Sequence, residues 1–325
     1  VEYENDIYNL TLNYDLGFAK LTSSTSELNL ARNTVSSSFV VQDLALNGGG
    51  IDLGISLVSK TFSQEIRLAS AGDDNAFNWV VGALYSDTDE HVYGTGGGYY
   101  IDGVGNDYGR YDEIRNSETL ALFTNIEYNF TDQLTLTVGT RYFEDDRTFR
   151  SDFPEFLIDI SNSESFDQVS PMISLSYALE EDISIYASIA EGFRSGGFNA
   201  YDIAVYDPET VRSYELGTKA SLLNGRLSVS SAIYHSQYLD YQGFDVIELA
   251  GATFISTVNP GEVELQGVEF SSQFNLSEQL SIGFNGHYVD TEFTKTSSDF
   301  PIFDVGDPVN ETPKYSYSLN TKYDF

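Results

Sequence analysis

Apolar and polar residues alternate along most of this chain, in long runs that are joined in pairs. The clearest runs are residues 134–140 and 183–189, where apolar residues stand at every second position. A strict period of two predicts β-strands with one apolar face. The alternation extends over about ten residues or more, which is the length a tilted strand needs to cross a bilayer and exceeds the roughly 5–6 residues of a usual strand.

Thirteen such strands are predicted, and the connections between them alternate between short and long. The strands are expected at residues 7–16, 18–29, 59–70, 76–88, 115–130, 133–148, 164–178, 182–193, 211–223, 226–240, 261–275, 279–293 and 313–325. Short turns are expected near Gly17 and at 71–75, 131–132, 180–181, 224–225 and 277–278, and long polar loops at 30–58, 89–114, 149–163, 194–210, 241–260 and 294–312. Asn224-Gly225 predicts a type I′ turn, whose two central residues need positive φ. This alternation favours an all-β, antiparallel transmembrane barrel of the outer-membrane type over a soluble sandwich.

The parity of each strand assigns its side chains to one of two faces. Toward lipid we expect Phe77, Trp79, Val81, Ala83, Tyr85, Leu120, Leu122, Ile126, Tyr128, Phe130, Leu280, Ile282, Phe284 and Tyr288. Toward the lumen we expect Glu65, Arg67, Glu127, Arg141, Glu215, Lys219, Glu269, Asn285 and His287. A charge on the lipid face at mid-bilayer costs roughly 2–4 kcal/mol, so the shared parity of these charged residues indicates a polar lumen.

Composition and charge narrow the classes of function. The chain has 325 residues, a net charge of −34 and no cysteine. The charge argues against nucleic-acid binding, which needs Lys and Arg to contact phosphates. The missing cysteines exclude a disulfide scaffold and any Cys-ligated metal site. The sequence gives no reason to expect a cofactor.

The sequence contains only weak motifs for catalysis or metal binding. His235 and Ser236 are adjacent, so on a strand they point to opposite faces and cannot belong to one catalytic triad. Asp87, Asp89, Glu90 and His91 offer ligands for a hard cation in a predicted loop, but a solvated acidic loop is the more ordinary interpretation.

Residues 186–199 have the sequence Tyr-Ala-Ser-Ile-Ala-Glu-Gly-Phe-Arg-Ser-Gly-Gly-Phe-Asn. This segment resembles a strand-to-loop segment found in many TonB-dependent outer-membrane receptors. The family's order is continued by segments 64–68, 77–82, 214–219, 224–227, 232–234, 241–242, 259–261 and 267–269. Its most specific part, called the marker segment below, comprises Glu191, Gly192, Phe193, Arg194, Ser195, Gly196, Gly197, Phe198 and Asn199.

The resemblance implies a barrel of 22 strands around an N-terminal plug domain, in the outer membrane of a Gram-negative bacterium. It implies contact with outer-membrane lipid and lipopolysaccharide, and with a TonB complex through an N-terminal box. Residues 1–6 contain no signal peptide, and neither plug nor box is found. An odd number of strands does not close a barrel of this kind. We therefore expect residues 1–325 to be part of the barrel, without plug, box or the last strands, although the terminal Phe325 also fits an assembly signal.

The resemblance further implies active uptake of a scarce, bulky solute, a small-molecule or metal-chelate substrate. A ferric siderophore is the first expectation, and a glycan or small aromatic compound stands behind it. Three alternatives remain at this point: a passive porin, a barrel enzyme and a soluble acidic β-protein. Five residues are candidate ligand contacts in the lumen or loops: Arg194, Asn199, Arg141, Lys219 and His287. Arg194 has a second interpretation, as an anchor of its loop to a carboxylate such as Glu191.

Overall fold

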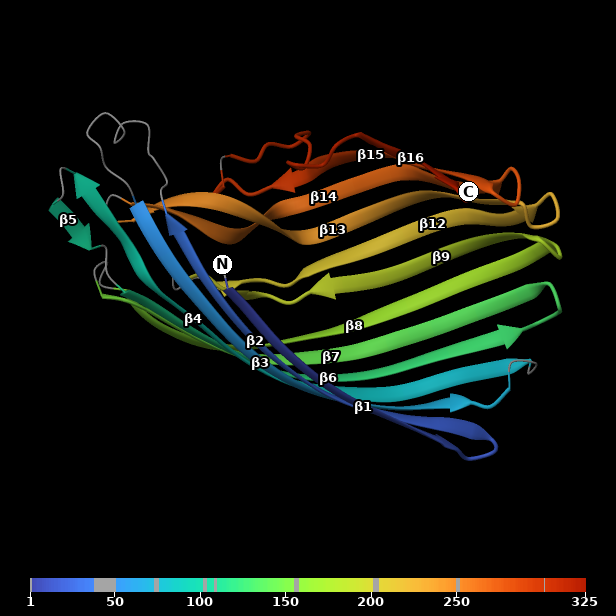
Figure 1. The fold of residues 1–325 in the computed structure, drawn as a ribbon, viewed down its shortest axis with the longest axis horizontal. Coiled ribbons are helices and arrows are strands. Elements are labelled where there is room, and N and C mark those ends of the chain that lie inside the picture. The colour runs from blue at the N-terminus through green and yellow to red at the C-terminus, as the bar shows by residue number, and fades with distance from the viewer. Residues whose placement is uncertain are drawn as a thin grey trace.

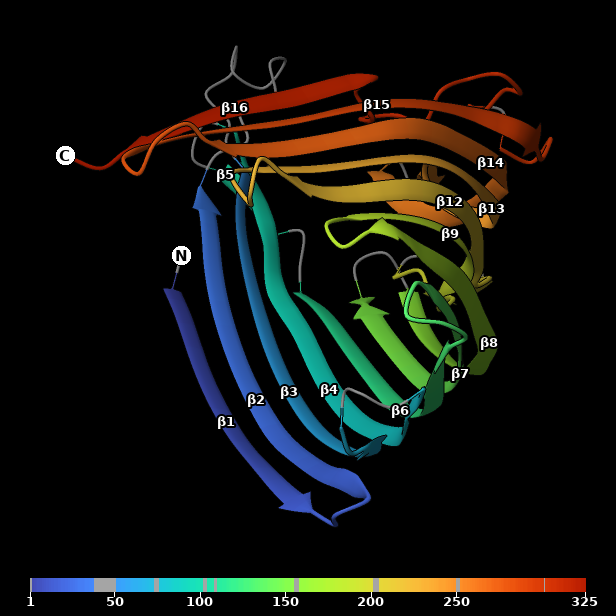
Figure 2. The same cartoon turned by 90° about the vertical axis from the view of Figure 1, so that its right-hand side faces the viewer.

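The chain forms one long antiparallel sheet that curves into an open arc (Figure 1, Figure 2). The computed structural model describes residues 2–37, 51–72, 76–101, 104–107, 110–154, 158–200, 205–249, 252–300 and 302–325. The strands are β1 (Glu2–Asp15), β2 (Ala19–Ser37), β3 (Ile51–Ser70), β4 (Phe77–Ile101), β5 (Val104–Asp107), β6 (Arg110–Asn129), β7 (Leu134–Phe153), β8 (Ile158–Glu180), β9 (Ile183–Arg194), β10 (Gly197–Phe198), β11 (Val205–Tyr206), β12 (Glu209–Leu222), β13 (Leu227–Leu249), β14 (Ala252–Asn275), β15 (Leu280–Thr296) and β16 (Tyr315–Tyr323).

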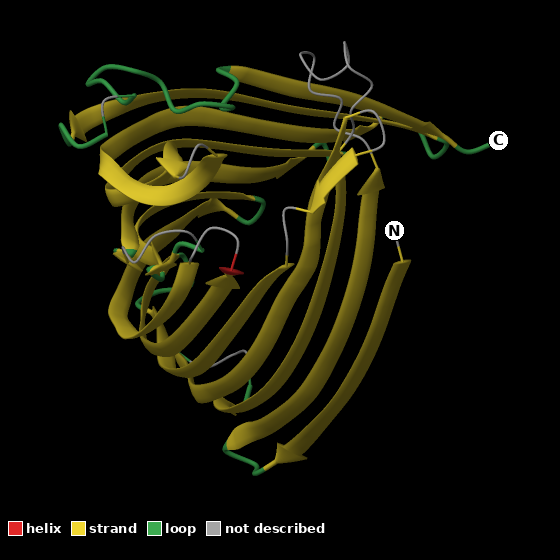
Figure 3. Ribbon diagram, turned by 90° about the vertical axis from the view of Figure 1, so that its left-hand side faces the viewer, coloured by secondary structure: helices red, strands yellow, loops and turns green. Residues whose placement is uncertain are grey.

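The predicted fold class is confirmed, and each of the thirteen predicted strands corresponds to one strand of the sheet. Their order in the sheet is β1-β2-β3-β4-β6-β7-β8-β9-β12-β13-β14-β15-β16, so each pairs with its predicted neighbours. β1 and β16 form the two free edges of the described arc, and the view in Figure 3 looks into its hollow. The short strands β5, β10 and β11 were not predicted.

Several predicted loops are wrong, because hairpins continue well past the alternating stretches. β7 and β8 stay paired from Leu134↔Tyr177 to Phe153↔Ile158, which leaves little of the predicted loop 149–163. β13 and β14 likewise fill most of 241–260, and β4 runs through the first part of 89–114. Beyond the bilayer a strand has no lipid face, so period-two alternation disappears while backbone pairing still satisfies each N–H and C=O. Within the described residues, loops 194–210 and 294–312 are confirmed, apart from the two short strands in the first and the strand ends at Arg194, Glu209 and Thr296; residues 201–204 and 301 lie outside the described ranges.

The short turns behave as their sequences predict. Asn224 and Gly225 have φ of 55° and 79°, and the N–H of Arg226 donates to the carbonyl of Leu223 at 3.4 Å, as a type I′ turn requires. Leu223 also has positive φ, which the sequence did not indicate. Thr131 and Ser277 accept backbone N–H bonds inside their turns. The predicted turn at 180–181 lies one residue later, because β8 extends to Glu180.

Strand register confirms the two predicted faces. The predicted lipid-facing residues of β4 and β6 are direct partners, as in Phe77↔Tyr128, and large side chains such as Leu122 are exposed there. The predicted lumen residues share the opposite, concave face. On that face Arg147 and Ser151 of β7 bind the segment that follows β9, which folds into the hollow of the arc. No helix among the described residues is long and apolar enough to span a membrane.

One irregularity of the sheet matters below. β8 pairs with β9 only from Met172↔Ala190 toward the short turn, and Pro171 is the next residue of β8. Proline has no N–H to donate to a neighbouring strand. The pairing of β8 with β7 continues past this point. β8 and β9 therefore separate above Pro171, and the chain after β9 is free to turn inward.

Candidate functional site: the concave wall and its mouth

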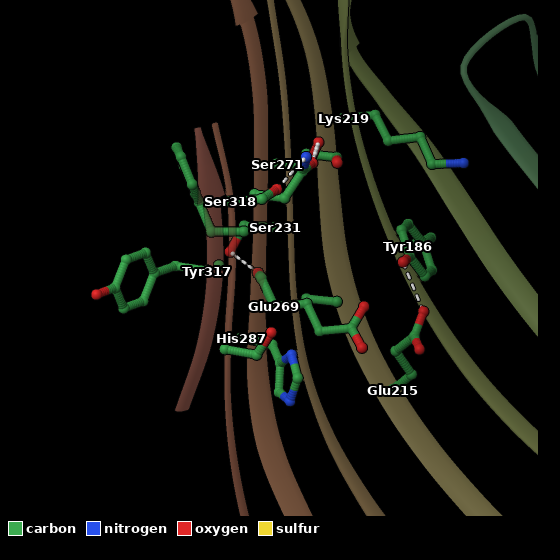
Figure 4. A pocket seen from close by; sticks show the side chains of 15 residues that line it. Tyr186, Glu215, Lys219, Ser231, Glu269, Ser271, His287, Tyr317 and Ser318 are labelled. Atoms are coloured by element: carbon green, nitrogen blue, oxygen red, sulfur yellow. Dashed lines mark hydrogen bonds between the residues drawn. The ribbon is translucent and has the colours of Figure 1, made fainter. Parts of the chain in front are cut away.

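The concave wall carries a group of ionisable side chains that we call the lumen patch, defined by Tyr186, Glu215, Lys219, Glu269 and His287 (Figure 4). They come from β9, β12, β14 and β15 and surround a hollow of about 350 Å³. The neighbouring wall is made of serines and asparagines, such as Ser271, whose hydroxyl bonds Asn285 Oδ1 at 2.7 Å. The patch is a polar surface on which both signs of charge are present.

Tyr186 is held in the lumen patch by a glycine of the next strand. Gly217 is its register partner, and a Cβ on Gly217 would overlap the tyrosine ring. The ring can therefore lie flat across β12, where its hydroxyl donates to Glu215 Oε1 at 2.5 Å. Lys219 Nζ lies 5.8 Å from the same ring centroid. Tyr186 thus binds a carboxylate through its hydroxyl group, and its ring lies near an ammonium group.

A second hollow, which we call the mouth cavity, lies on the same face nearer the long connections. Its volume is about 540 Å³, and its polar lining includes Glu90, Glu113, Arg115 and Arg147. Its aromatic lining is Phe149, Phe198 and Tyr206. Phe149 stacks on Phe198 with ring centroids 5.6 Å apart, and Arg115 lies 5.8 Å from the Phe149 ring. Phe149 is only 3% exposed, so a ligand there would meet the half-buried rings of Phe198 and Tyr206 together with the charged groups.

The charges of the mouth cavity form ion pairs. Arg115 donates to Glu90 at 3.0 Å and to Glu113 at 2.5 Å. Arg147 Nε donates to Asp145 at 2.6 Å, and Asp145 is only 1% exposed. Burial raises the pKa of Glu113, against the opposing charge and hydrogen bond of Arg115. The buried carboxylates fix the two guanidinium groups in place, which prepares the cavity wall before any ligand enters.

The chain after β9 crosses the hollow from β7 to β14 and forms one side of the mouth cavity. On the β7 side, Arg147 Nη1 donates to the carbonyl of Gly196 at 2.7 Å. On the β14 side, the Asn199 amide makes two bonds with the backbone of Thr257, both at 2.8 Å. Asn259 accepts from the N–H of Asp207 at 2.8 Å. The described residues 195–200 and 205–207, which we call the crossing segment, therefore contact distant strands of the arc.

The presence of glycine at residue 196 of the marker segment is explained by steric constraint. A Cβ on Gly196 would overlap the carbonyl oxygen of Tyr206 and the ring of Phe166. The backbone can pass this point only without a side chain. The residue pattern of the marker segment thus reflects the close approach of its backbone to β8 and β11.

Arg194 anchors the crossing segment, and its partner differs from the one expected. Its Nη2 donates to Glu209 Oε2 at 3.0 Å, and the backbone N–H of Gln242 donates to the same oxygen at 2.7 Å. Gln242 in turn donates to the carbonyls of Ser195 and Asp207. The suggested partner Glu191 instead binds Arg212 on the outward face. The Glu191 assignment was therefore wrong.

The other sequence candidates fall in different places. Lys219 and His287 lie together in the lumen patch. Asn199 lines the mouth cavity, with its amide bound to Thr257. Arg141 lies on the concave wall, 5.5 Å from the ring of Phe143, and lines neither hollow. The five candidates therefore do not form one site.

Sequence reasoning missed the ion pairs of the mouth cavity. Glu113 with Arg115, and Asp145 with Arg147, repeat an acid and an arginine two residues apart on neighbouring strands. Two residues apart on a strand means the same face. That repeated spacing is the available signal, and its first member, Glu113, falls within the predicted loop 89–114 and not within a predicted strand.

The minor chemical motifs are not supported by geometry. Ser236 donates to Ser213 Oγ on the concave face, while His235 stacks on Tyr214 on the outward face, as their adjacency predicted. Asp87, Asp89, Glu90 and His91 belong to β4 and not to a loop, so that interpretation was wrong. His91 binds Asp112, and Glu90 binds Arg115 on the other face. Within the described ranges, no group of three or more His, Asp or Glu side chains is placed to hold a metal ion.

The curved antiparallel sheet, its apolar convex band and its polar hollow define the wall of a transmembrane β-barrel. A family model described as "TonB dependent receptor-like, beta-barrel" matches residues 1–325. The chain therefore belongs to the TonB-dependent receptor family, whose members are outer-membrane proteins of Gram-negative bacteria and are receptors and transporters rather than enzymes.

Individual relatives agree with this assignment. The chain is 24% identical over 263 residues to the pesticin receptor of Yersinia enterocolitica, covering 78% of this chain and 36% of the receptor. It is 28% identical over 167 residues to the metal-pseudopaline receptor CntO of Pseudomonas aeruginosa, covering 51% of this chain and 22% of CntO. The crystal structure of the ferric yersiniabactin uptake receptor FyuA from Yersinia pestis superposes with a TM-score of 0.76 at 20% identity, over 98% of this chain and 46% of FyuA. The chain thus spans less than half the length of these relatives.

Proposed function

We propose that this chain is part of the wall of an active outer-membrane transporter that takes up a ferric siderophore. The family match over residues 1–325 is the observation that carries the proposal. Relatives named for metal chelates, such as the metal-pseudopaline receptor and the ferric yersiniabactin uptake receptor, support the substrate class.

We place ligand contact at the mouth cavity. Its half-buried rings, Phe198 and Tyr206, and its positioned arginines offer stacking and hydrogen-bond contacts to a metal chelate. Arg115 is the group we assign to the ligand, because its side chain is 48% exposed although it binds two carboxylates. We assign Arg194 and Asn199 to holding the crossing segment, since their side chains donate hydrogen bonds to Glu209 and to the backbone of Gln242 and Thr257.

The remaining parts of the proposal concern the parent protein. We infer that a plug domain fills the polar hollow, that the complete barrel has 22 strands, and that TonB contacts the parent outside this chain. The match to only 36% of the pesticin receptor supports a longer parent. We further infer that the chain catalyses no reaction, which the separation of His235 from Ser236 supports.

Growth of a deletion strain tests the substrate class. Under iron limitation the strain should fail to use the cognate ferric siderophore and should regain growth when the parent gene is restored. Uptake should stop when a protonophore removes the proton gradient, whereas a passive porin would continue. Normal growth on iron chelates combined with lost growth on a single glycan would contradict the siderophore assignment.

Arg115→Ala tests the location of the site. The variant should raise the concentration of chelate needed for half-maximal uptake while the protein still reaches the membrane. Arg67→Ala, on the concave wall but outside both hollows, is the matched control. Equal effects of the two substitutions would contradict the mouth cavity as the binding site.

A further inference from the structure

A trough crosses the outward face of the sheet over β6, β7 and β8. Its floor is a row of small side chains formed by register partners, Thr124↔Thr140 and Thr140↔Pro171. The trough has a volume of about 340 Å³. It is a depression in a face that otherwise carries large apolar side chains.

Larger side chains form rows on both sides of the trough. Toward the short turns, the register places Ile126, Val138, Ile173 and Ile189 in one row across four strands. Toward the long connections, the row is Leu122, Tyr142 and Val169. The trough thus forms because three neighbouring strands each place a small outward residue in the same register row.

Pro171 extends the trough toward β9. Because the pairing of β8 with β9 stops at Met172↔Ala190, the two strands separate beside Pro171 and the trough continues between them. Glu191 lines this end. Its carboxylate accepts from Arg212 Nε at 2.7 Å, and the Arg212 side chain is 54% exposed.

The level of the trough identifies the leaflet that covers it. On β8 the outward apolar band runs from Tyr177 near the short turn to Val169, and Pro171 lies next to Val169. Beyond the band, toward the long connections, acidic residues replace the apolar ones on the outward face. Glu144 is an example, and it accepts a hydrogen bond from the Tyr142 hydroxyl at 2.9 Å. The trough therefore lies in the half of the band nearer the long connections, which face the cell exterior in barrels of this class.

We propose that this trough is a binding site for one acyl chain of lipopolysaccharide. It is continuous with the lipid-facing band, so its occupant is a membrane lipid, and lipopolysaccharide supplies the acyl chains of the outer leaflet. A chain that fills the trough covers apolar surface on three sides, which a chain against the flat band does not. At the end of the trough, Arg212 is placed to contact a phosphate of the same lipid, the anion that a guanidinium group recognises best.

The test measures lipid that remains with the parent protein. Wild-type protein is extracted from outer membranes, exchanged into a mild detergent and analysed for the hydroxylated fatty acids that mark lipopolysaccharide. Thr140→Phe fills the floor of the trough and should reduce bound lipopolysaccharide severalfold. Ser272→Phe places the same ring on the outward face of β14, away from the trough, and should leave the amount unchanged. Arg212→Gln should weaken retention and make it less sensitive to salt.

Three results would overturn the proposal. Wild-type protein could hold no lipopolysaccharide after exchange, Thr140→Phe could retain the wild-type amount, or the bound fatty acids could be those of phospholipid. If Thr140→Phe does not assemble, Thr140→Leu fills the trough with less volume and gives the same comparison. The outcome is independent of substrate uptake, so it does not depend on the proposed function.

Discussion

Tyr186 of β9 lies over Gly217 of β12, and its hydroxyl donates to Glu215 Oε1 at 2.5 Å. The ring occupies the space that a side chain at residue 217 would need. Two residues that are distant in the sequence therefore define the shape of the lumen patch. The relationship also explains why a tyrosine and a glycine occur at these positions of the two adjacent strands.

Gly217→Ala should destabilise the barrel wall. The added Cβ overlaps the Tyr186 ring, and overpacking of this kind costs about 1–3 kcal/mol. The heat-dependent shift of the folded band on a denaturing gel should occur at a lower temperature. Gly192→Ala is the matched control, because a Cβ there meets only Val211 Cγ1 at 3.4 Å. If the two variants unfold at the same temperature, the close contact is not a constraint on the fold.

Leu122→Arg should impair assembly far more than Asn125→Arg. Leu122 is 50% exposed on the outward face, where an arginine costs up to roughly 2–4 kcal/mol, the value reached at mid-bilayer. Asn125 has the opposite parity and faces the concave wall, where its register partners are Val80 and Gly139. The amount of folded protein in purified outer membranes measures the difference. Equal tolerance of both substitutions would contradict the assignment of faces.

Asn199→Ala should loosen the crossing segment. The substitution removes two hydrogen bonds to Thr257, and each contributes about 0.5–1.5 kcal/mol. We expect faster cleavage of the crossing segment when intact cells are exposed to protease. Asn5→Ala, at an exposed position of β1, should leave the cleavage rate unchanged. Unaltered cleavage of Asn199→Ala would show that the segment is held by its other contacts alone.

Glu113, in the mouth cavity, should make the free energy of unfolding of the protein depend on pH. Burial raises the pKa of this carboxyl group above its ordinary 4.5. A group whose pKa is raised by folding contributes stability that is fully present below the unfolded pKa and is lost as pH rises through the folded pKa. Relative to Glu113→Gln, wild-type protein should therefore lose stability as the pH rises above 4.5.

Denaturant unfolding of the two proteins across this pH range measures the effect. Glu118→Gln, on the outward face of the same strand, is the control. A stability difference between wild type and Glu113→Gln that does not change with pH would contradict the prediction. So would an equal change for Glu118→Gln.

The sequence predicted the sheet better than the site. Alternation identified every strand of the main path and the face of residues such as Leu122 and Lys219, since lipid permits only one parity of apolar residues. It failed above the bilayer, where β4 and β6 continue without alternation and carry Glu90 and Glu113 into the mouth cavity. In that region hydrogen bonding between the backbones of neighbouring strands determines the structure. The side chains show no period-two alternation from which a strand could be predicted.

The sequence by itself determined the family, the strand order and the two faces, because these follow from local periodicity and from ordered motifs. Only the tertiary structure decided which distant residues meet. Arg147 reaches Gly196, Arg194 pairs with Glu209 rather than Glu191, and small residues on three strands align into an outward trough. These contacts depend on strand register and on the inward path of the crossing segment. Both are set by hydrogen bonding between segments far apart in the chain, which leaves no local signal in the sequence.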